Sequence, residues 1–218
     1  MEELHFERGA DLKTDILDLA EVMFREYGYD ATTFQKIADQ LGISKGAITY
    51  HFKNKHMIMD TIIQEFFDSI RVFIDSFPDL YRNSYWRYCT MYIYALRTIL
   101  KNKRNQDLFY HKDQVALWET LKVERLKMNY RAIAKDFQKY FTDEELTMTA
   151  YFDLGARARL FREYQNSSNS ISIDKFCYYQ AYLIGCLARL DEATIRINIE
   201  HAFAFANQFP LPLKRLFT

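Results

Sequence analysis

Apolar residues recur every three or four positions along most of the chain, which is the spacing that places them on one face of an α-helix. Residues that interrupt helices are scarce. The only prolines are Pro78, Pro210 and Pro212, and no glycine occurs between Gly46 and Gly155. No segment shows the strict alternation typical of a half-buried strand. The pattern therefore predicts an all-α protein.

The longer predicted helices begin and end at recognisable signals. Gly28 is placed to end the first of them, and Thr142 with Glu145 has the spacing of a capping box. A break is expected near Tyr110–Lys112. The predicted helices are Leu12–Tyr27, Lys55–Phe77, Tyr85–Lys101, Gln106–Tyr140, Asp143–Tyr164, Ile173–Leu190 and Glu192–Phe209.

The segment Thr32–Ile58 predicts two short helices joined by a tight turn, followed by the start of a longer helix. Thr32 and Gln35 can form a capping box, and Gly42 is suited to end the first short helix. Ser44 is a good N-cap for the second, in which Ile48 and Phe52 point inward. The apolar face of the first helix consists of Phe34, Ile37, Ala38 and Leu41. A helix-turn-helix with small and polar residues on its outer face suits the major groove of DNA.

Two parts of this segment resemble the signature of TetR-family transcriptional regulators. They are Gly42-Ile43-Ser44-Lys45-Gly46 and Tyr50-His51-Phe52-Lys53-Asn54-Lys55, and the preceding Gly28–Thr33 and Ile37-Ala38 fit the same pattern. The resemblance covers about the first quarter of the chain. One position departs from the pattern: Thr49 stands where an aromatic residue is common, and the tyrosine follows as Tyr50.

The resemblance implies which residues contact DNA. Those implied for phosphates are Thr33, Ser44, Tyr50, His51 and Lys55, and those implied for base edges are Lys45, Gly46, Ala47 and Thr49. Physical chemistry favours the same division. Lys55 is expected in the first turn of the next helix, where backbone amides favour an anion. Lys45 is the only long side chain placed to contact a guanine.

The resemblance also implies an organisation and a function. Residues 1–54 are expected to form a three-helix DNA-binding domain (the head), and residues 55–218 a larger helical ligand-binding and dimerisation domain, with residues 55–77 as the connecting helix. The implied function is that of a cytoplasmic homodimeric repressor, which a small molecule releases from a pseudo-palindromic operator. Activation or co-repression stays open as the sign of regulation.

The charge distribution is consistent with a dimer. The chain has 29 basic and 29 acidic side chains, so it has no overall positive field. Residues 1–30 carry three basic and nine acidic side chains, whereas residues 31–58 carry four lysines and one aspartate. Positive charge is thus concentrated in the helix-turn-helix. Such modest charge predicts few phosphate contacts per subunit, and a dimer doubles them.

Aromatic residues make up 17% of the chain and favour a ligand pocket in the larger domain. The Tyr85–Lys101 helix is apolar over much of its circumference, which predicts a central helix surrounded by others. Buried tyrosines need partners for their hydroxyl groups, so a cavity with polar anchor points is expected. The alternative is that these side chains are plain core. The residues expected to line the pocket are Trp86, Tyr92, Phe109, Trp118, Met128, Tyr151, Phe152 and Tyr178.

Two stripes of mostly small residues in the last helices suggest a helix–helix interface. They are Cys177, Ala181, Gly185 and Ala188, and then Ile195, Ile199, Ala202, Ala206 and Phe209. Small side chains let helices approach closely, as in a four-helix interface between two subunits. Packing within one subunit is the alternative. The resemblance favours a homodimer through the C-terminal helices.

Other function classes find little support. The three cysteines are widely spaced in apolar runs, which is typical of buried reduced thiols, and no residue spacing predicts a metal site or a cofactor. No apolar run is long enough to cross a membrane, and the acidic N-terminus does not resemble a signal peptide. No catalytic arrangement is recognisable, so an enzyme is not expected. Two alternatives stay open: a helical small-molecule carrier or enzyme with a vestigial DNA-binding head, and a dimeric regulator without a small ligand.

Overall fold

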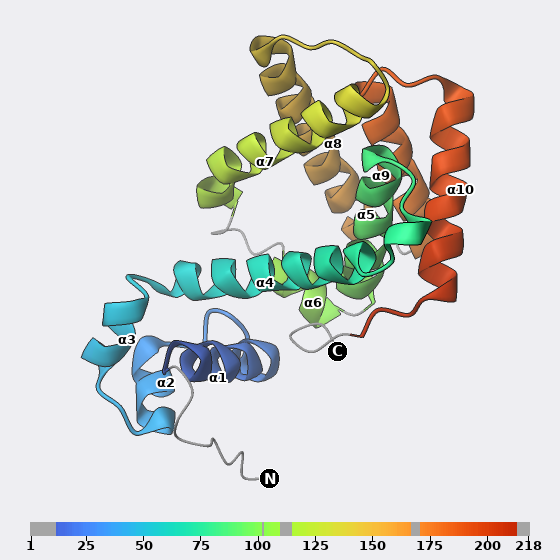
Figure 1. Ribbon diagram of the computed structural model, residues 1–218. Helices are drawn as coiled ribbons and strands as arrows, with labels where there is room; N and C mark the ends of the chain where they lie inside the picture. Colours follow the sequence, from blue (N-terminus) through green and yellow to red (C-terminus); the bar gives the residue numbers. More distant parts are fainter. Residues whose placement is uncertain (1–11, 102, 110–114, 167–170, 213–218) are drawn as a thin grey trace. The chain divides into compact units, whose positions relative to one another are not determined.

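Every regular element in the part of the chain that the structure describes is helical. The computed structural model describes residues 12–101, 103–109, 115–166 and 171–212, with the backbone alone over residues 115–122. The helices are α1 (Leu12–Tyr27), α2 (Phe34–Leu41), α3 (Lys45–His51), α4 (Lys55–Asp75), a 3-10 turn η1 (Pro78–Leu80), α5 (Ser84–Leu100), α6 (Lys103–Phe109), α7 (Val115–Asp136), α8 (Asp143–Asn166), α9 (Ile173–Leu187) and α10 (Glu192–Gln208) (Figure 1). The all-α prediction is confirmed.

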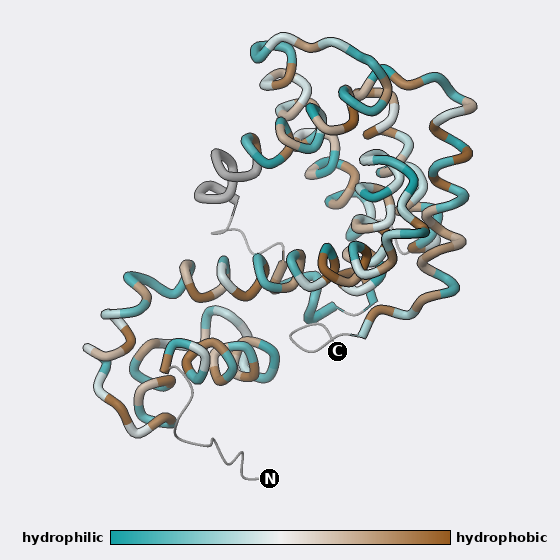
Figure 2. The backbone as a smooth tube through the Cα atoms, viewed as in Figure 1, coloured by the Kyte–Doolittle hydropathy of each residue, from teal (hydrophilic) through white to brown (hydrophobic). Residues whose placement is uncertain are grey.

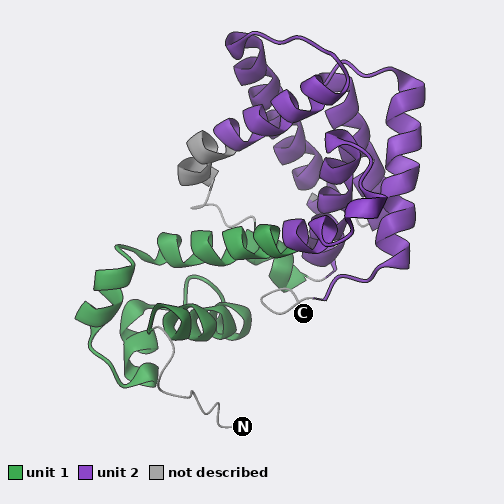
Figure 3. Ribbon diagram, viewed as in Figure 1, with its two compact units in different colours: residues 1–69, 102–111, 213–218 green, residues 70–101, 112–212 purple. Residues whose placement is uncertain are grey.

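The described residues form two compact units (Figure 3). Unit 1 contains residues 12–69 and 103–109, and unit 2 contains residues 70–101, 115–166 and 171–212. Helix α4 continues from unit 1 into unit 2, and the division falls between Ser69 and Ile70. No described helix combines the length and the apolar character needed to span a bilayer.

Unit 1 is built on the amphipathic helix α1, which packs against α2, α3 and α6. Its apolar face is fully buried at Ile16 and Leu19, and it meets Ile37 of α2 and Ile48 of α3 in one core. Gly28 ends the helix with a positive φ of 86°, as expected. The predicted first helix has the observed bounds, because its apolar spacing and its terminating glycine agree.

Unit 2 is built around α5, which packs against α7, α9 and α10. Most of α5 is buried, including Trp86, whose ring lies edge-on to Phe205 of α10 at 5.3 Å between centroids. The prediction of a central, surrounded helix is therefore confirmed. Figure 2 shows hydrophobic and hydrophilic residues alternating along the helices around it, as amphipathic helices require.

Helices α7 and α9 end three or more residues earlier than the sequence predicts, and for the same reason. Helix α7 ends at Asp136, where Gln138 adopts a φ of 51° and Lys139 N–H donates to the Ala134 carbonyl at 2.8 Å. Helix α9 ends at Leu187, where Arg189 adopts a φ of 60°. Both ends use the left-handed conformation that usually calls for glycine, so no glycine marks them in the sequence.

The small-residue stripes of α9 and α10 pack inside the subunit, so the intramolecular alternative is the correct one for them. Cys177, Ala181 and Ala188 are buried against neighbouring helices, as are Ile195 and Ala202. At Gly185 an added Cβ would lie 2.5 Å from Ile195 Cγ1 and 2.7 Å from the Tyr85 hydroxyl. The glycine permits close packing between α9, α10 and α5. A subunit interface, if these helices form one, must use their other faces.

Gly185→Ala is expected to lower the free energy of unfolding by about 1–3 kcal/mol, because the new methyl group overpacks a full core. Gly155→Ala is the matched control: Gly155 lies within α8 with no atom within 4 Å of an added Cβ. There the higher helix propensity of alanine should raise stability by up to about 1 kcal/mol. Urea unfolding followed by circular dichroism measures both. If both substitutions changed the free energy of unfolding equally, lack of space at Gly185 would not be the cause of the loss.

Candidate nucleic-acid interface

The N-cap of α2, the first helix of the helix-turn-helix, lies one residue later than predicted. The Thr33 side chain accepts a hydrogen bond from Lys36 N–H and so caps α2, while Thr32 is buried and its hydroxyl donates to the Gly28 carbonyl at 2.9 Å. Gln35 bonds Asp39 rather than the backbone at the cap. With two threonines in succession, burial decides which one caps. The predicted capping box at Thr32 is therefore wrong. Thr33 caps the helix instead, and the hydrogen bond from Lys36 N–H fixes its side chain.

The second helix, α3, presents a polar outer face. Ser44 caps it by accepting from Ala47 N–H at 3.1 Å, and Ile48 and Phe52 anchor it in the core, as expected. On the opposite face Lys45, Gly46 and Thr49 are exposed, with Ala47 half-buried. Tyr50 is 86% exposed and lies edge-on to the His51 ring. These exposed side chains do not pack into the core of the head, so they are available to bind a partner.

A shallow hollow lies beside this face, between the start of α2, α3 and the turn into α4. It encloses about 490 Å³ and is lined by Thr32, Thr33, Phe34, Lys45, Thr49, Lys53, Asn54 and Lys55. We call it the lysine hollow. The ammonium groups of Lys45 and Lys53 and the hydroxyl group of the exposed Thr33 can bind phosphate oxygens. Lys53 is an addition to the predicted set: it precedes Asn54, whose side chain accepts from Met57 N–H at the start of α4.

Lys55 has a different role in the structure from the phosphate contact that the sequence predicts. It begins α4, as expected, but its ammonium group donates to the carbonyls of Tyr29 at 2.6 Å and Thr32 at 2.9 Å. The same group lies 4.1 Å from the centre of the Tyr29 ring. These contacts tie the start of α4 to the turn between α1 and α2. The Lys55 ammonium group is therefore engaged within the head, and its phosphate contact stays a prediction.

The residues predicted to line a ligand pocket are not gathered around one cavity. Trp86 is core, whereas Met128, Tyr151 and Phe152 are more than half exposed. Phe109 belongs to unit 1, where its ring lies 6.0 Å from that of Phe67, and the side chain of Trp118 lies outside the described residues. Aromatic character alone did not distinguish the core side of a helix from its outer side. Tyr92 and Tyr178 remain, and they lie in two separate places.

Tyr92 belongs to a polar cluster inside unit 2, formed by α5, α7 and α8. Arg157 makes a bidentate ion pair with Asp153, its second amino nitrogen, Nη2, lies 3.2 Å from the Tyr88 hydroxyl, and its guanidinium carbon lies 3.9 Å from the Tyr92 ring centre. The Tyr130 hydroxyl donates to Asp153 at 3.0 Å. Burial raises the pKa of the Asp153 carboxyl to about 7 and lowers the pKa of the Arg157 guanidinium. The charged forms of Asp153 and Arg157 therefore depend on the ion pair between them and on their hydrogen-bond partners.

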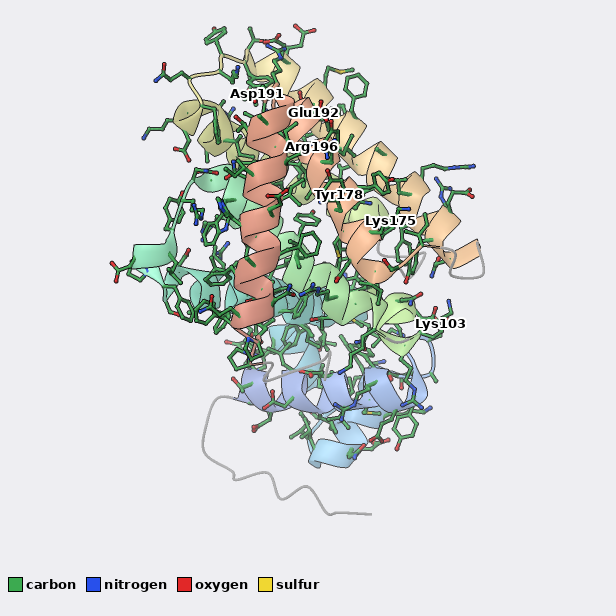
Figure 4. All side chains as sticks on the ribbon, turned by 90° about the vertical axis from the view of Figure 1, so that its right-hand side faces the viewer. Lys103, Lys175, Tyr178, Asp191, Glu192 and Arg196 are labelled. Atoms are coloured by element: carbon green, nitrogen blue, oxygen red, sulfur yellow. The ribbon has the colours of Figure 1, made fainter. Side chains whose placement is uncertain are left out.

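Tyr178 belongs to a tyrosine surface on the outer side of α9 and α10. The surface comprises Lys175, Tyr178, Tyr179, Tyr182 and Arg196, which line a shallow hollow of about 470 Å³. The rings of Tyr178 and Tyr182 stack at 6.0 Å, and Arg196 donates to the Tyr178 hydroxyl at 3.2 Å. Figure 4 shows Arg196, Tyr178 and Lys175 following one another along this side of unit 2, after Asp191 and Glu192.

Comparison with known proteins agrees with this description of the head. The family model described as "Bacterial regulatory proteins, tetR family" matches residues 16–61. The HTH-type transcriptional repressor KstR2 of Rhodococcus jostii (strain RHA1) is 40% identical over 58 residues, which are 27% of this chain and 28% of that protein. The icaADBC operon regulator IcaR of Staphylococcus aureus (strain Newman), named a negative transcriptional regulator, is 39% identical over 57 residues, or 26% and 31%. The chain thus matches less than a third of the length of these curated relatives.

Solved structures extend the similarity to the fold of nearly the whole chain. The complex of RolR with resorcinol has a TM-score of 0.61 and 13% identity over 92% of this chain and 95% of that one. SmeT, the repressor of a Stenotrophomonas maltophilia multidrug efflux pump, has a TM-score of 0.54 and 15% identity over 81% and 90%. Residues 16–61 thus match the TetR family of bacterial regulatory proteins, and the all-α fold of the chain is similar to that of RolR and SmeT.

Proposed function

We propose that this protein is a ligand-responsive transcriptional regulator, a homodimeric repressor that leaves a pseudo-palindromic operator when a small molecule binds. The observation that carries the proposal is the lysine hollow beside the exposed face of α3, which places cations and hydroxyl groups next to a helix able to enter the major groove. The names of the relatives that share the head support repression. A ligand-bound structure of the same fold supports an effector.

The proposed division of labour follows the chain. Residues 1–54 read DNA, residues 55–218 bind the effector and the second subunit, and α4 connects the two functions. Helix α4 is continuous over 21 residues. Since no loop interrupts it, a displacement of its end in unit 2 can be transmitted to the head. An effector shifts the population of two states only through its different affinity for them. Pivoting of α4 would then change the distance between the two recognition helices.

Binding to the DNA upstream of the protein's own gene tests the proposal. Fluorescence anisotropy with labelled upstream fragments should show specific, saturable binding that weakens steeply with salt, because phosphate contacts release counterions. A fragment of equal length from inside the coding sequence is the control. Binding that is absent, or equal on both fragments at all salt concentrations, would refute the proposed function.

The tyrosine surface supports the homodimer. Tyrosine and arginine are enriched at interfaces, and Tyr179 is half exposed on this side of α9. Acidic Asp191 and Glu192 lie at one end of the surface and Lys175 at the other (Figure 4). A two-fold axis through the tyrosines would bring the acidic end of one copy to the basic end of the other. This interface replaces the small-residue stripes, which are buried in the subunit.

Tyr179→Glu is expected to convert the dimer into a monomer at micromolar concentration, because the carboxylate would be buried without a partner at a two-fold interface. Tyr140→Glu makes the same change at another exposed tyrosine, in the loop after α7, and should leave the mass unchanged. Sedimentation velocity gives the mass of each. If Tyr179→Glu also sediments as the wild type does, the interface lies elsewhere.

A further inference from the structure

The polar cluster of unit 2 has an unusual feature at its arginine. The Arg157 side chain is 13% exposed and the Asp153 side chain is fully buried. Four hydrogen bonds involve this pair: two join Arg157 to Asp153, one joins Arg157 to Tyr88, and one joins Tyr130 to Asp153. Arg157 Nη1, in contrast, is buried and has no hydrogen-bond partner among the described residues. A buried donor without an acceptor destabilises the folded state, because its lost hydration is not replaced. A group of this kind calls for an explanation, such as a bound molecule.

The surroundings of Arg157 Nη1 are aromatic. The guanidinium stacks on Tyr92, and the Tyr92 ring meets the Tyr88 ring edge-on at 5.0 Å. Tyr92 is half-buried, so the cluster extends to the edge of the core on this side. Planar guanidinium and tyrosine rings favour a flat, aromatic molecule, which can lie face-on to the guanidinium and edge-on to a ring.

Charge balance narrows the chemistry of that molecule. Arg157 and Asp153 already neutralise each other, and burying a further anion beside the Asp153 carboxylate would leave a net negative charge inside the bundle. A hydroxyl oxygen accepts a hydrogen bond from Nη1 without adding charge. We propose that the Arg157–Asp153 cluster is the polar anchor of the effector site and that it takes a neutral aromatic compound carrying a hydroxyl group. This assignment rests on the proposed effector-responsive function.

Phenol is the simplest probe, since a phenolic hydroxyl of ordinary pKa near 10 is neutral at pH 7. Isothermal titration of the full chain should show phenol binding more than tenfold tighter than benzene, which has the ring but no acceptor. Benzoate, which has a charged acceptor, should bind more weakly than phenol. Benzoate binding as tight as phenol, or no phenol binding at millimolar concentration, would overturn the assignment.

Two variants connect the binding to Arg157. Arg157→Lys keeps a cation opposite Asp153 but lacks the planar fork, and it should weaken phenol at least tenfold. Because a single change can unfold the bundle, Asp153→Leu with Arg157→Met replaces the whole pair by apolar side chains, an exchange that is often neutral for stability. This double variant should bind phenol no better than benzene. Phenol affinity equal to that of the wild type in the folded double variant would refute the role of the pair.

The two proposals fail separately. Operator binding is measured on the same preparations. A wild-type protein that binds operator but not phenol leaves the proposed function standing and removes the ligand assignment. A protein that binds phenol through Arg157 but binds no operator fragment would do the opposite.

Discussion

Asp153→Ala is expected to lower the free energy of unfolding by about 3–5 kcal/mol, which is the typical cost of removing one partner from a buried ion pair. The loss has a specific cause. Asp153 accepts two hydrogen bonds from Arg157 and one from Tyr130. Its removal leaves the Arg157 guanidinium in the bundle with the Tyr88 hydroxyl and the Tyr88 and Tyr92 rings as its partners among the described residues. Chemical unfolding followed by circular dichroism measures the change.

The same helix offers a matched control. Arg159 and Glu163 form an ion pair of the same spacing on α8, but both side chains are more than half exposed. Glu163→Gln should therefore change the stability by less than about 0.5 kcal/mol, as is usual for exposed pairs on a helix. If both variants lose the same amount, burial is not what makes the Asp153 pair important.

Lys45→Ala is expected to weaken operator binding by roughly 30-fold or more. A lysine contact to a guanine contributes about 1–3 kcal/mol, and a dimer makes the contact in both half-sites. The other side chains near the base edges are short: Ala47 and Thr49 can offer only a methyl or a hydroxyl contact. Discrimination between operator and unrelated DNA should also fall. Anisotropy titrations against both DNAs measure the two effects.

Lys55→Met is the informative comparison, because the structure and the sequence assign Lys55 different roles. If Lys55 bound a phosphate in each subunit, its replacement would reduce the salt slope of operator binding by about 1.8 per dimer. Since the ammonium group is bound to the carbonyls of Tyr29 and Thr32, we expect the slope to be unchanged and the head to unfold more easily. A reduced slope with unchanged head stability would restore the phosphate role.

Local signals in the sequence were sufficient for several helix ends. Gly42 ends α2 with a φ of 65°, Ser44 caps α3, and Thr142 with Glu145 forms the reciprocal capping box at the start of α8. Each of these depends on residues within four positions of one another, so the chemistry is readable in the sequence itself. The central position of α5 was readable too, because a helix that is apolar on most sides has to be surrounded.

The errors arose where a long-range contact decides between local alternatives. Thr32 and Thr33 are equivalent as caps until burial assigns Thr32 to the core. Gln138 and Arg189 end their helices in a conformation that their residue types do not announce.

The sequence by itself determined most of the helices and the exposed face of α3, because periodicity and capping are short-range patterns, and it carries the helix-turn-helix motif on which the proposed DNA partner rests. Only the tertiary structure decided which apolar faces are interior. It buried the small-residue stripes of α9 and α10, exposed Met128, Tyr151 and Phe152, and brought Arg157, Asp153, Tyr88 and Tyr130 together. Those residues come from three helices, and whether their side chains meet depends on how the helices are rotated in the bundle, which no single segment specifies.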